Sequence, residues 1–235
     1  MALPFFYKED IDLSAAEIVL DEDTSKHVVQ VLRMQAGEAL QLTDGKGKKI
    51  MAAITDANRK RCAVMVTQTE NSDAPTANVA IAISLVKNSS RFEWFLEKVT
   101  EIGVTEIIPL ICSRTEKQSF KYDRMKSILV SAMLQSQQSW LPEIKEPTSF
   151  RKGIETFRHQ QKFIAYISDG HEAHLSDLIN SNLTSQVVLI GPEGDFTGEE
   201  IDLAMMYNFL PASLGPNRLR TETAGLVALT LLQAE

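Results

Sequence analysis

The spacing of apolar and polar residues changes along the chain and divides it into two regions. In the first region, residues 39–43, 49–55 and 61–67 alternate apolar with polar positions, as half-buried strands do. Residues 4–7 form a further candidate strand at the start of the chain. Between the strands at 39–43 and 49–55, the sequence Asp44-Gly45-Lys46-Gly47 is a strong signal for a hairpin turn.

A short helix is expected between the candidate strand at residues 4–7 and the strand at residues 39–43. Asp23 or Thr24 can cap its first turn, because a side-chain oxygen there satisfies backbone N–H groups, and Gly37 is suited to end it. The first region therefore predicts a small, β-rich domain over residues 1–71.

In the second region, after a polar stretch at 71–78 that contains Pro75, strands and helices alternate. The strands are expected at 79–85, 105–110, 163–167 and 187–190, and helices at 90–102, at 124–136 and from about residue 197. Repeated strand–helix alternation implies a mainly parallel sheet with helices on both faces. The sequence thus predicts an α/β domain over residues 72–235.

Composition and charge narrow the class of protein. The 235 residues are 44% apolar and 23% charged, which is typical of a globular protein, and no apolar run approaches a membrane span. The net charge of −7 argues against a strongly basic nucleic-acid binder but leaves room for a local basic patch. Cys62 and Cys112 have no CxxC spacing, so we expect two reduced thiols in a cytoplasmic protein without a membrane partner.

Two predicted strands near the C-terminus end in turns of similar composition. The apolar run at 187–190 breaks at Gly191-Pro192-Glu193-Gly194, and the run at 209–214 breaks at Gly215-Pro216. Thr221 or Thr223 is expected to cap the last helix. Loops at the carboxyl ends of parallel strands are where ligands bind in open α/β sheets. From spacing alone, two ordinary strand-to-helix turns explain the pattern equally well.

The first region contains two groups of basic residues. Lys46, Lys48 and Lys49 lie at the predicted hairpin, and Arg59, Lys60 and Arg61 lie at the next turn. They are consistent with a phosphate-contacting edge that supplies salt-dependent affinity, or with two solvated turns.

Metal and Rossmann-type cofactor chemistry have little support. His171 and His174 have i, i+3 spacing without an evident third ligand, so a surface helix start is the better interpretation and no metal is expected. The chain contains no GxGxxG fingerprint and no Walker loop.

The two C-terminal motifs carry a resemblance to a known family. GPEGDFTGEE from Gly191 and LGPNRLRTETA from Leu214 look like the paired motifs of the SPOUT-type RNA methyltransferases. Within that superfamily the chain most resembles the 16S rRNA (uracil-N3) methyltransferases of the small-subunit methyltransferase E family. Residues 27–37 are similar to the PUA-like β-barrel at the N-terminus of that family, and residues 87–103 to its first strand–helix unit.

The resemblance implies a fold and a cofactor. The C-terminal domain would contain a deep trefoil knot, in which S-adenosyl-L-methionine lies bent against three loops, and a second subunit would complete the site in a homodimer. The implied cofactor residues are Leu189, Ile190, Gly191, Pro192, Glu193, Gly194, Leu214, Gly215, Leu219, Arg220, Thr221, Glu222, Thr223 and Ala224. Among them Leu189, Leu214 and Leu219 could sandwich the adenine, and the glycines let the backbone approach the ligand.

The implied reaction is methylation of a uridine at N3 in 16S rRNA of the small ribosomal subunit. That nitrogen must lose its proton, so the site needs a group that stabilises the uracil anion and a base. Arg220 is the candidate for stabilisation. Glu222 or Glu193 is the candidate base, although either could instead cap a helix or bind the cofactor.

The resemblance also marks candidate RNA contacts. Arg33 is the best candidate in the PUA-like region, with the six basic residues of the two turns beside it, and Arg91 and Arg114 are candidates in the second domain. Gln138 stands where the family pattern leads us to expect an arginine. Two alternatives remain open: a SPOUT enzyme for another rRNA or tRNA base, and a non-catalytic RNA-binding factor of ribosome assembly.

Overall fold

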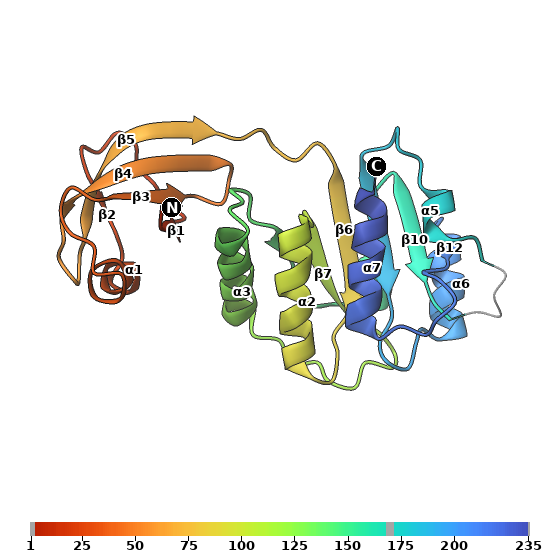
Figure 1. The fold of residues 1–235 in the computed structure, drawn as a ribbon. Helices are drawn as coiled ribbons and strands as arrows, with labels where there is room; N and C mark the ends of the chain where they lie inside the picture. Colours follow the sequence, from red (N-terminus) through yellow and green to blue (C-terminus); the bar gives the residue numbers. More distant parts are fainter. Residues whose placement is uncertain (1–2, 168–171, 235) are drawn as a thin grey trace. The chain divides into compact units, whose positions relative to one another are not determined.

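The computed structural model describes residues 3–167 and 172–234, and these residues form two compact units (Figure 1). One unit comprises Met1–Ala74 together with Met133–Leu141, and the other comprises Pro75–Ala132 with Pro142–Glu235. The predicted second domain, residues 72–235, includes residues 133–141, which lie in the first unit. The predicted domain boundary between residues 71 and 72 stays a prediction.

A five-stranded sheet with the order β1-β3-β4-β5-β2 builds the first unit. Its strands are β1 (Phe5–Tyr7), β2 (Ile18–Val19), β3 (Ala39–Thr43), β4 (Lys48–Asp56) and β5 (Ala63–Asn71). Strands β1 and β3 pair in parallel, and the other pairs are antiparallel. The candidate strand at residues 4–7 and the three strands predicted from alternation are confirmed, and their buried apolar residues supply the core of this unit.

The predicted hairpin between β3 and β4 is also confirmed. The carboxylate of Asp44 accepts hydrogen bonds from the backbone N–H groups of Lys46 (2.8 Å) and Lys48 (3.2 Å), which closes the turn. Gly47 has a φ of 97°, and a Cβ there would lie 2.6 Å from the Trp140 ring. This close approach attaches the segment Met133–Leu141 to the first unit.

The helix of the first unit differs from the prediction at both ends. Helix α1 (Glu22–Lys26) continues into one π-helical turn, η1 (His27–Val31). Its N-cap is Asp21, whose carboxylate accepts from the backbone N–H of Thr24 (2.9 Å), so the predicted cap at Asp23 or Thr24 was wrong. The helix does not extend to Gly37, because Arg33 adopts a left-handed φ of 57°.

An all-parallel sheet with the order β12-β10-β11-β6-β7-β8 forms the centre of the second unit (Figure 1). Its strands are β6 (Asn78–Ser84), β7 (Glu106–Ile111), β8 (Glu143–Ile144), β10 (Gln161–Ala165), β11 (Ser185–Ile190) and β12 (Leu210–Ala212), and β9 (Thr148–Ser149) pairs with β7. The predicted parallel sheet is confirmed. The two-residue strands β8 and β9 were missed, because such short segments show no periodicity.

Helices cover both faces of this sheet, as predicted. They are α2 (Ser89–Ile102), α3 (Tyr122–Gln135), α4 (Phe150–Ile154), α5 (Leu175–Leu178), α6 (Gly198–Met206) and α7 (Thr221–Gln233). Helices α2 and α7 pack together on one face, where a Cβ at Gly225 of α7 would lie 2.6 Å from the ring of Phe95 in α2. Helices α4 and α6 pack on the other face against β6, β10 and β11. None of the described helices is both long and apolar enough to cross a membrane.

Candidate functional site

A cavity of about 750 Å³ opens at the carboxyl ends of three neighbouring strands. Ala165, Ile190 and Ala212, the last residues of β10, β11 and β12, lie in its wall. The rest of the wall comes from the loops that follow these strands and from the first turn of α7. The cavity therefore lies where ligands bind in open parallel sheets.

The loop after β11 turns sharply before α6 begins. A Cβ at Gly191 would lie 3.2 Å from the Phe196 ring, so glycine permits this close packing. At the end of the loop, Thr197 and Glu200 form a capping box, with each side chain accepting from the backbone N–H of the other residue. The predicted helix start near Thr197 is confirmed.

Asp195 connects two walls of the cavity. It has a left-handed φ of 64°, a conformation that costs a non-glycine residue on the order of 1 kcal/mol. Its carboxylate accepts from the backbone N–H of Ile167 in the loop after β10 (2.8 Å) and from that of Phe196 (2.8 Å). The bond from Ile167 holds the loops after β10 and β11 together, and the bond from Phe196 lies within the loop after β11.

The loop after β12 leads directly into α7. Gly215 has a φ of 118°, which favours glycine, and it lies in the cavity wall with Leu214. The N-cap of α7 is Arg220, so the predicted caps Thr221 and Thr223 were wrong. Within the part of the chain that the structure describes, the Arg220 side chain makes no capping hydrogen bond, and it lies exposed at the cavity wall.

Most of the predicted cofactor residues line this cavity. They are Ile190, Gly191, Pro192, Glu193, Leu214, Gly215, Leu219, Arg220, Thr221 and Ala224. Leu189, Gly194, Glu222 and Thr223 do not. Leu189 is fully buried in the core against α4 and α6, so its side chain is not placed to sandwich an adenine.

Sequence reasoning missed several residues of the wall. They are Ala165, Tyr166, Ile167, Asp195, Ala212, Ser213, Pro216, Asn217 and Arg218. Tyr166 and Ile167 were assigned to a strand, but β10 ends at Ala165. The tyrosine hydroxyl donates to Glu172 (3.1 Å), and burial together with this bond raises the pKa of Tyr166.

The two candidate bases occupy different environments. Glu193 is exposed in the cavity wall, and its Oε1 accepts from the backbone N–H of Lys87 (3.0 Å). The Glu222 side chain is 8% exposed and its Oε1 lies 3.8 Å from Nε of Arg91. Among the described residues, Oε2 of Glu222 has no hydrogen-bond partner.

The basic residues of the first unit form two separate groups. Lys46, Lys48 and Lys49 lie at the start of β4, whereas Arg59, Lys60 and Arg61 follow its end. Nine residues of extended strand separate them by about 30 Å. Lys48 pairs with Asp44 (3.3 Å), and Lys49 donates to the carbonyl of Gln137 (2.7 Å).

Two other predicted contacts, Arg91 and Arg114, have partners within their own unit, and so does Gln138. Arg91 faces Glu222, and the guanidinium of Arg114 donates to backbone carbonyls of the loop after β11. The side-chain amide of Gln138, at the position where an arginine was expected, donates to Ser136 Oγ (3.0 Å).

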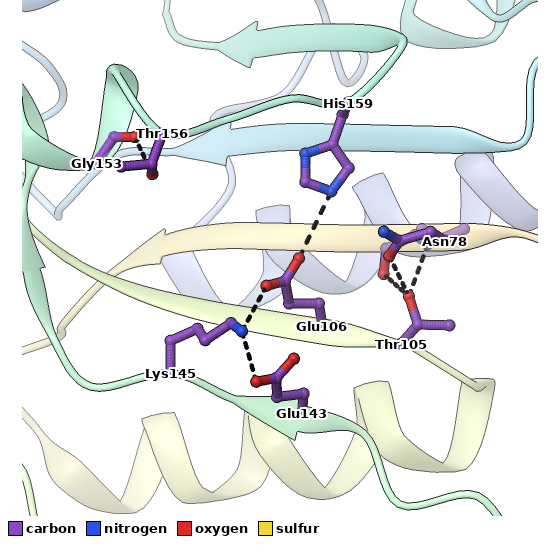
Figure 2. A network of polar contacts seen from close by, with 9 residues as sticks. Asn78, Thr105, Glu106, Glu143, Lys145, Gly153, Thr156 and His159 are labelled. Atoms are coloured by element: carbon purple, nitrogen blue, oxygen red, sulfur yellow. Dashed lines mark hydrogen bonds and ion pairs between the residues drawn. The ribbon is translucent and has the colours of Figure 1, made fainter.

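A second, smaller cavity of about 410 Å³ lies at the amino ends of the parallel strands. Glu106 of β7 lies in it between His159 (Nε2 at 3.6 Å) and Lys145 (Nζ at 3.4 Å), and Lys145 also contacts Glu143 (Figure 2). The His159 ring and the Lys145 ammonium lower the pKa of Glu106, although burial acts in the opposite direction.

In residues 3–167 and 172–234, no group of three or more His, Cys, Asp and Glu side chains could hold a metal ion. His171 of the histidine pair lies outside the described residues. His174 caps α5, with its Nδ1 accepting from the backbone N–H of Ser176 (3.4 Å). Cys62 and Cys112 are free, buried thiols.

Comparison with known proteins gives the class that this fold and cavity represent. A family described as "RNA methyltransferase domain" matches residues 72–233, and "RNA methyltransferase PUA domain" matches residues 20–66. The molecule is therefore an RNA methyltransferase with a PUA domain near its N-terminus, which confirms the predicted fold class. The trefoil knot stays a prediction.

Individual relatives narrow the class to one family. Ribosomal RNA small subunit methyltransferase E of Synechocystis is 32% identical over 93% of this chain and 73% of its own length. A probable rRNA-methyltransferase from Porphyromonas gingivalis has 39% identity and a TM-score of 0.90, covering 98% of both chains. The Neisseria gonorrhoeae ribosomal RNA small subunit methyltransferase E, in a structure described as bound to S-adenosyl methionine, has 28% identity and a TM-score of 0.88, covering 99% and 97%. The chain belongs to the ribosomal RNA small subunit methyltransferase E family.

Proposed function

We propose that this protein uses S-adenosyl-L-methionine to methylate N3 of a specific uridine in 16S rRNA of the small ribosomal subunit. The observation that carries the proposal is the cavity at the carboxyl ends of β10, β11 and β12, whose walls come from both C-terminal motifs. Membership of the small subunit methyltransferase E family and the S-adenosyl methionine in the Neisseria relative support it.

The cavity fits this cofactor in size and in chemistry. Its volume of about 750 Å³ is within the range of small-molecule sites. Backbone groups of three loops can bond the polar atoms of the adenosine and methionine parts, while Leu214 and Leu219 supply apolar contact. When bound, the cofactor supplies an electrophilic methyl group on a sulfonium.

Arg220 is proposed to stabilise the uracil anion. N3 of uracil is a weakly acidic imide that becomes nucleophilic only as it loses its proton, which places negative charge on the neighbouring oxygens. Arg220 carries a guanidinium group, lies in the cavity wall and is exposed there at the start of α7. Its guanidinium can therefore face the developing charge.

Of the two candidate bases, we propose Glu193. A general base must reach the proton that it removes, and Glu193 is exposed in the cavity wall. The hydrogen bond from Lys87 N–H to its Oε1 leaves Oε2 for that role. Glu222 is buried beside Arg91 and outside the wall, so we assign it a structural role at the start of α7.

The PUA-like unit is proposed to bind RNA through Arg33 and the basic residues of its two turns. Arg33, Lys46, Arg59, Lys60 and Arg61 are exposed, and such residues give salt-dependent contacts to phosphates. Because N3 lies on the Watson–Crick edge, the target uridine must be unpaired or extruded. We also propose the trefoil knot, a homodimer that completes the site, and a cytoplasmic location.

The test is methyl transfer from labelled S-adenosyl-L-methionine to unmethylated small subunits, naked 16S rRNA and bulk tRNA, followed by nucleoside analysis. We expect the label as 3-methyluridine in the small-subunit RNA. Label in tRNA would instead identify a different substrate for the same fold. Cofactor binding without transfer to any of the three would favour the non-catalytic assembly factor.

A further inference from the structure

Arg114 connects two loops of the second unit that are far apart in the sequence. It follows β7, and its guanidinium Nη1 donates to the carbonyl oxygens of Gly194 (2.7 Å) and Phe196 (3.2 Å) in the loop after β11. A single nitrogen therefore bonds two carbonyls on either side of Asp195. Hydrogen bonds from a charged donor are the stronger kind.

The loop after β11 is shaped to receive this arginine. A Cβ at Gly194 would lie 3.2 Å from Cδ and 3.4 Å from Cβ of Arg114, so the glycine leaves room for the aliphatic part of the side chain. Gly194 is not part of the cavity wall. Its lack of a side chain is explained by the packing of Arg114.

The two carbonyls flank the strained residue of the cavity. Asp195, with its φ of 64°, lies in the wall, and its carboxylate holds Ile167 in the loop after β10. The Gly194 carbonyl belongs to the peptide group that precedes Asp195, and the Phe196 carbonyl to the peptide group that follows Phe196, so the two bonds hold both ends of the Asp195–Phe196 segment. Arg114 therefore acts on two walls of the cavity without being part of either.

Arg114 is itself held in place by its neighbours. The backbone N–H and hydroxyl of Ser113 donate to Oε1 of Glu200 (2.8 and 3.1 Å), whose Oε2 forms the capping box of α6. On the other side, Thr115 Oγ1 accepts from the backbone N–H of Cys112 (2.9 Å) and lies 2.8 Å from Ser84 Oγ. The arginine thus extends from a fixed base.

We propose that Arg114 is a positioning residue for the cofactor cavity, in place of the RNA contact implied by the resemblance. The inference rests on the proposed function only in that the cavity binds S-adenosyl-L-methionine. An arginine that contacts phosphate would contribute to the salt dependence of RNA affinity. An arginine that orders the loop after β11 contributes to cofactor affinity instead. Without it, the loop would have to become ordered when the cofactor binds, and this ordering would weaken binding.

The experiment measures cofactor affinity by calorimetry and RNA affinity over a series of salt concentrations for wild type, Arg114→Ala, Arg114→Lys and Lys117→Ala. For Arg114→Ala we expect Kd and KM for the cofactor to rise about tenfold, the equivalent of about 1.4 kcal/mol, with a smaller change in kcat. Arg114→Lys should recover part of the affinity, because an ammonium can still donate to one carbonyl. Lys117→Ala, which removes an exposed charge three residues away, should match wild type.

Each result separates the possibilities. If wild type does not bind the cofactor, the proposed function fails. If wild type and Arg114→Ala bind it equally while the RNA salt slope falls by about one, Arg114 contacts a phosphate and the inference is wrong. If wild type and Arg114→Ala have equal cofactor affinity and the same salt slope of RNA affinity, the inference is wrong as well. If Arg114→Ala does not fold, as judged by circular dichroism, Arg114→Lys alone decides, and wild-type cofactor affinity for it would count against positioning.

Discussion

The two ends of the parallel sheet in the second unit are built differently. At the carboxyl ends, loops rich in glycine and proline bring backbone groups to a cavity of about 750 Å³, and Arg220 and Glu193 are exposed in its wall. At the amino ends, a cavity of about 410 Å³ contains Glu106, which is surrounded by His159 and Lys145 (Figure 2).

The difference shows which charged groups are available for chemistry. At the amino ends, the Glu106 carboxylate lies 3.4 Å from the Lys145 ammonium and 3.6 Å from Nε2 of His159, and the opposite charge of Lys145 lowers the cost of burying the carboxylate. At the carboxyl ends, backbone hydrogen bonds hold the loops, as in the bonds from Ile167 and Phe196 to Asp195, and Arg220 remains exposed. We therefore expect substitutions at the carboxyl ends to change turnover and substitutions at the amino ends to change stability.

The largest effect is expected for Arg220→Ala. Loss of a charged group that faces the developing uracil anion should lower kcat by about 10²–10³-fold. The cofactor Kd should stay close to that of wild type, since the backbone of the loop, rather than this side chain, is expected to hold the cofactor. Single-turnover methylation and calorimetry measure the two quantities separately.

Arg158→Ala is the matched control for this prediction. Arg158 lies in the wall of the amino-end cavity and is also exposed. It should retain wild-type kcat. If Arg220→Ala turns over as fast as wild type, Arg220 has no role in the mechanism. If Arg220→Ala and Arg158→Ala lose kcat equally, the two ends of the sheet do not differ in their contribution to turnover.

The next largest effect on kcat is expected for Glu193→Gln, and Glu222→Gln is the variant with which it is compared. If Glu193 is the base, its amide variant should lower kcat about a hundredfold, because an amide cannot accept the proton of N3. The glutamine retains an oxygen that can accept from Lys87 N–H, so the loop should keep its position. Rate–pH profiles of both variants provide the measurement.

Glu222→Gln should instead lower thermal stability with little change in kcat, because Arg91 loses its charged partner at 3.8 Å. The opposite pattern, with turnover lost in Glu222→Gln and retained in Glu193→Gln, would reverse the assignment.

The sequence predicted the position of the site better than its individual contacts. Breaks at Gly191-Pro192 and Gly215-Pro216 mark strand ends, because adjacent glycine and proline are a strong turn signal. Leu189 was misplaced because a strand covered on both faces is apolar at every position, so its pattern does not show which side chains face the cavity. Asp195 was missed since its role depends on Ile167, which comes from another strand end.

The two groups of basic residues in the first unit show that closeness in sequence can mislead about distance in space. The two groups are close in the sequence, and this suggested a single phosphate-binding edge. An extended strand rises about 3.3 Å per residue, so β4 carries Lys49 and Arg59 far apart. Closeness in sequence predicts closeness in space for a helix turn, but not across a strand.

The smallest effect is expected at the amino ends, in the pH dependence of stability. His159 and Lys145 lower the pKa of Glu106 below its ordinary value of 4.5 in the folded protein. A group whose pKa is lower in the folded state stabilises the fold above its unfolded-state pKa, and this contribution is lost as the pH falls through the folded-state value. Glu106→Gln should therefore lower the free energy of unfolding at pH 7 by about 1 kcal/mol.

The difference between wild type and Glu106→Gln should shrink as the pH falls below about 4.5, the ordinary pKa of the carboxyl group, because the wild-type carboxylate then becomes protonated. Urea unfolding at a series of pH values measures this difference. Glu143→Gln changes the exposed partner of the same lysine and should have a smaller effect, since exposed ion pairs contribute little. Turnover at pH 7 should be unchanged in both variants. A loss of cofactor affinity in Glu106→Gln, or a stability difference that persists at pH 3, would show that the amino-end cavity does more than hold neutralised charges.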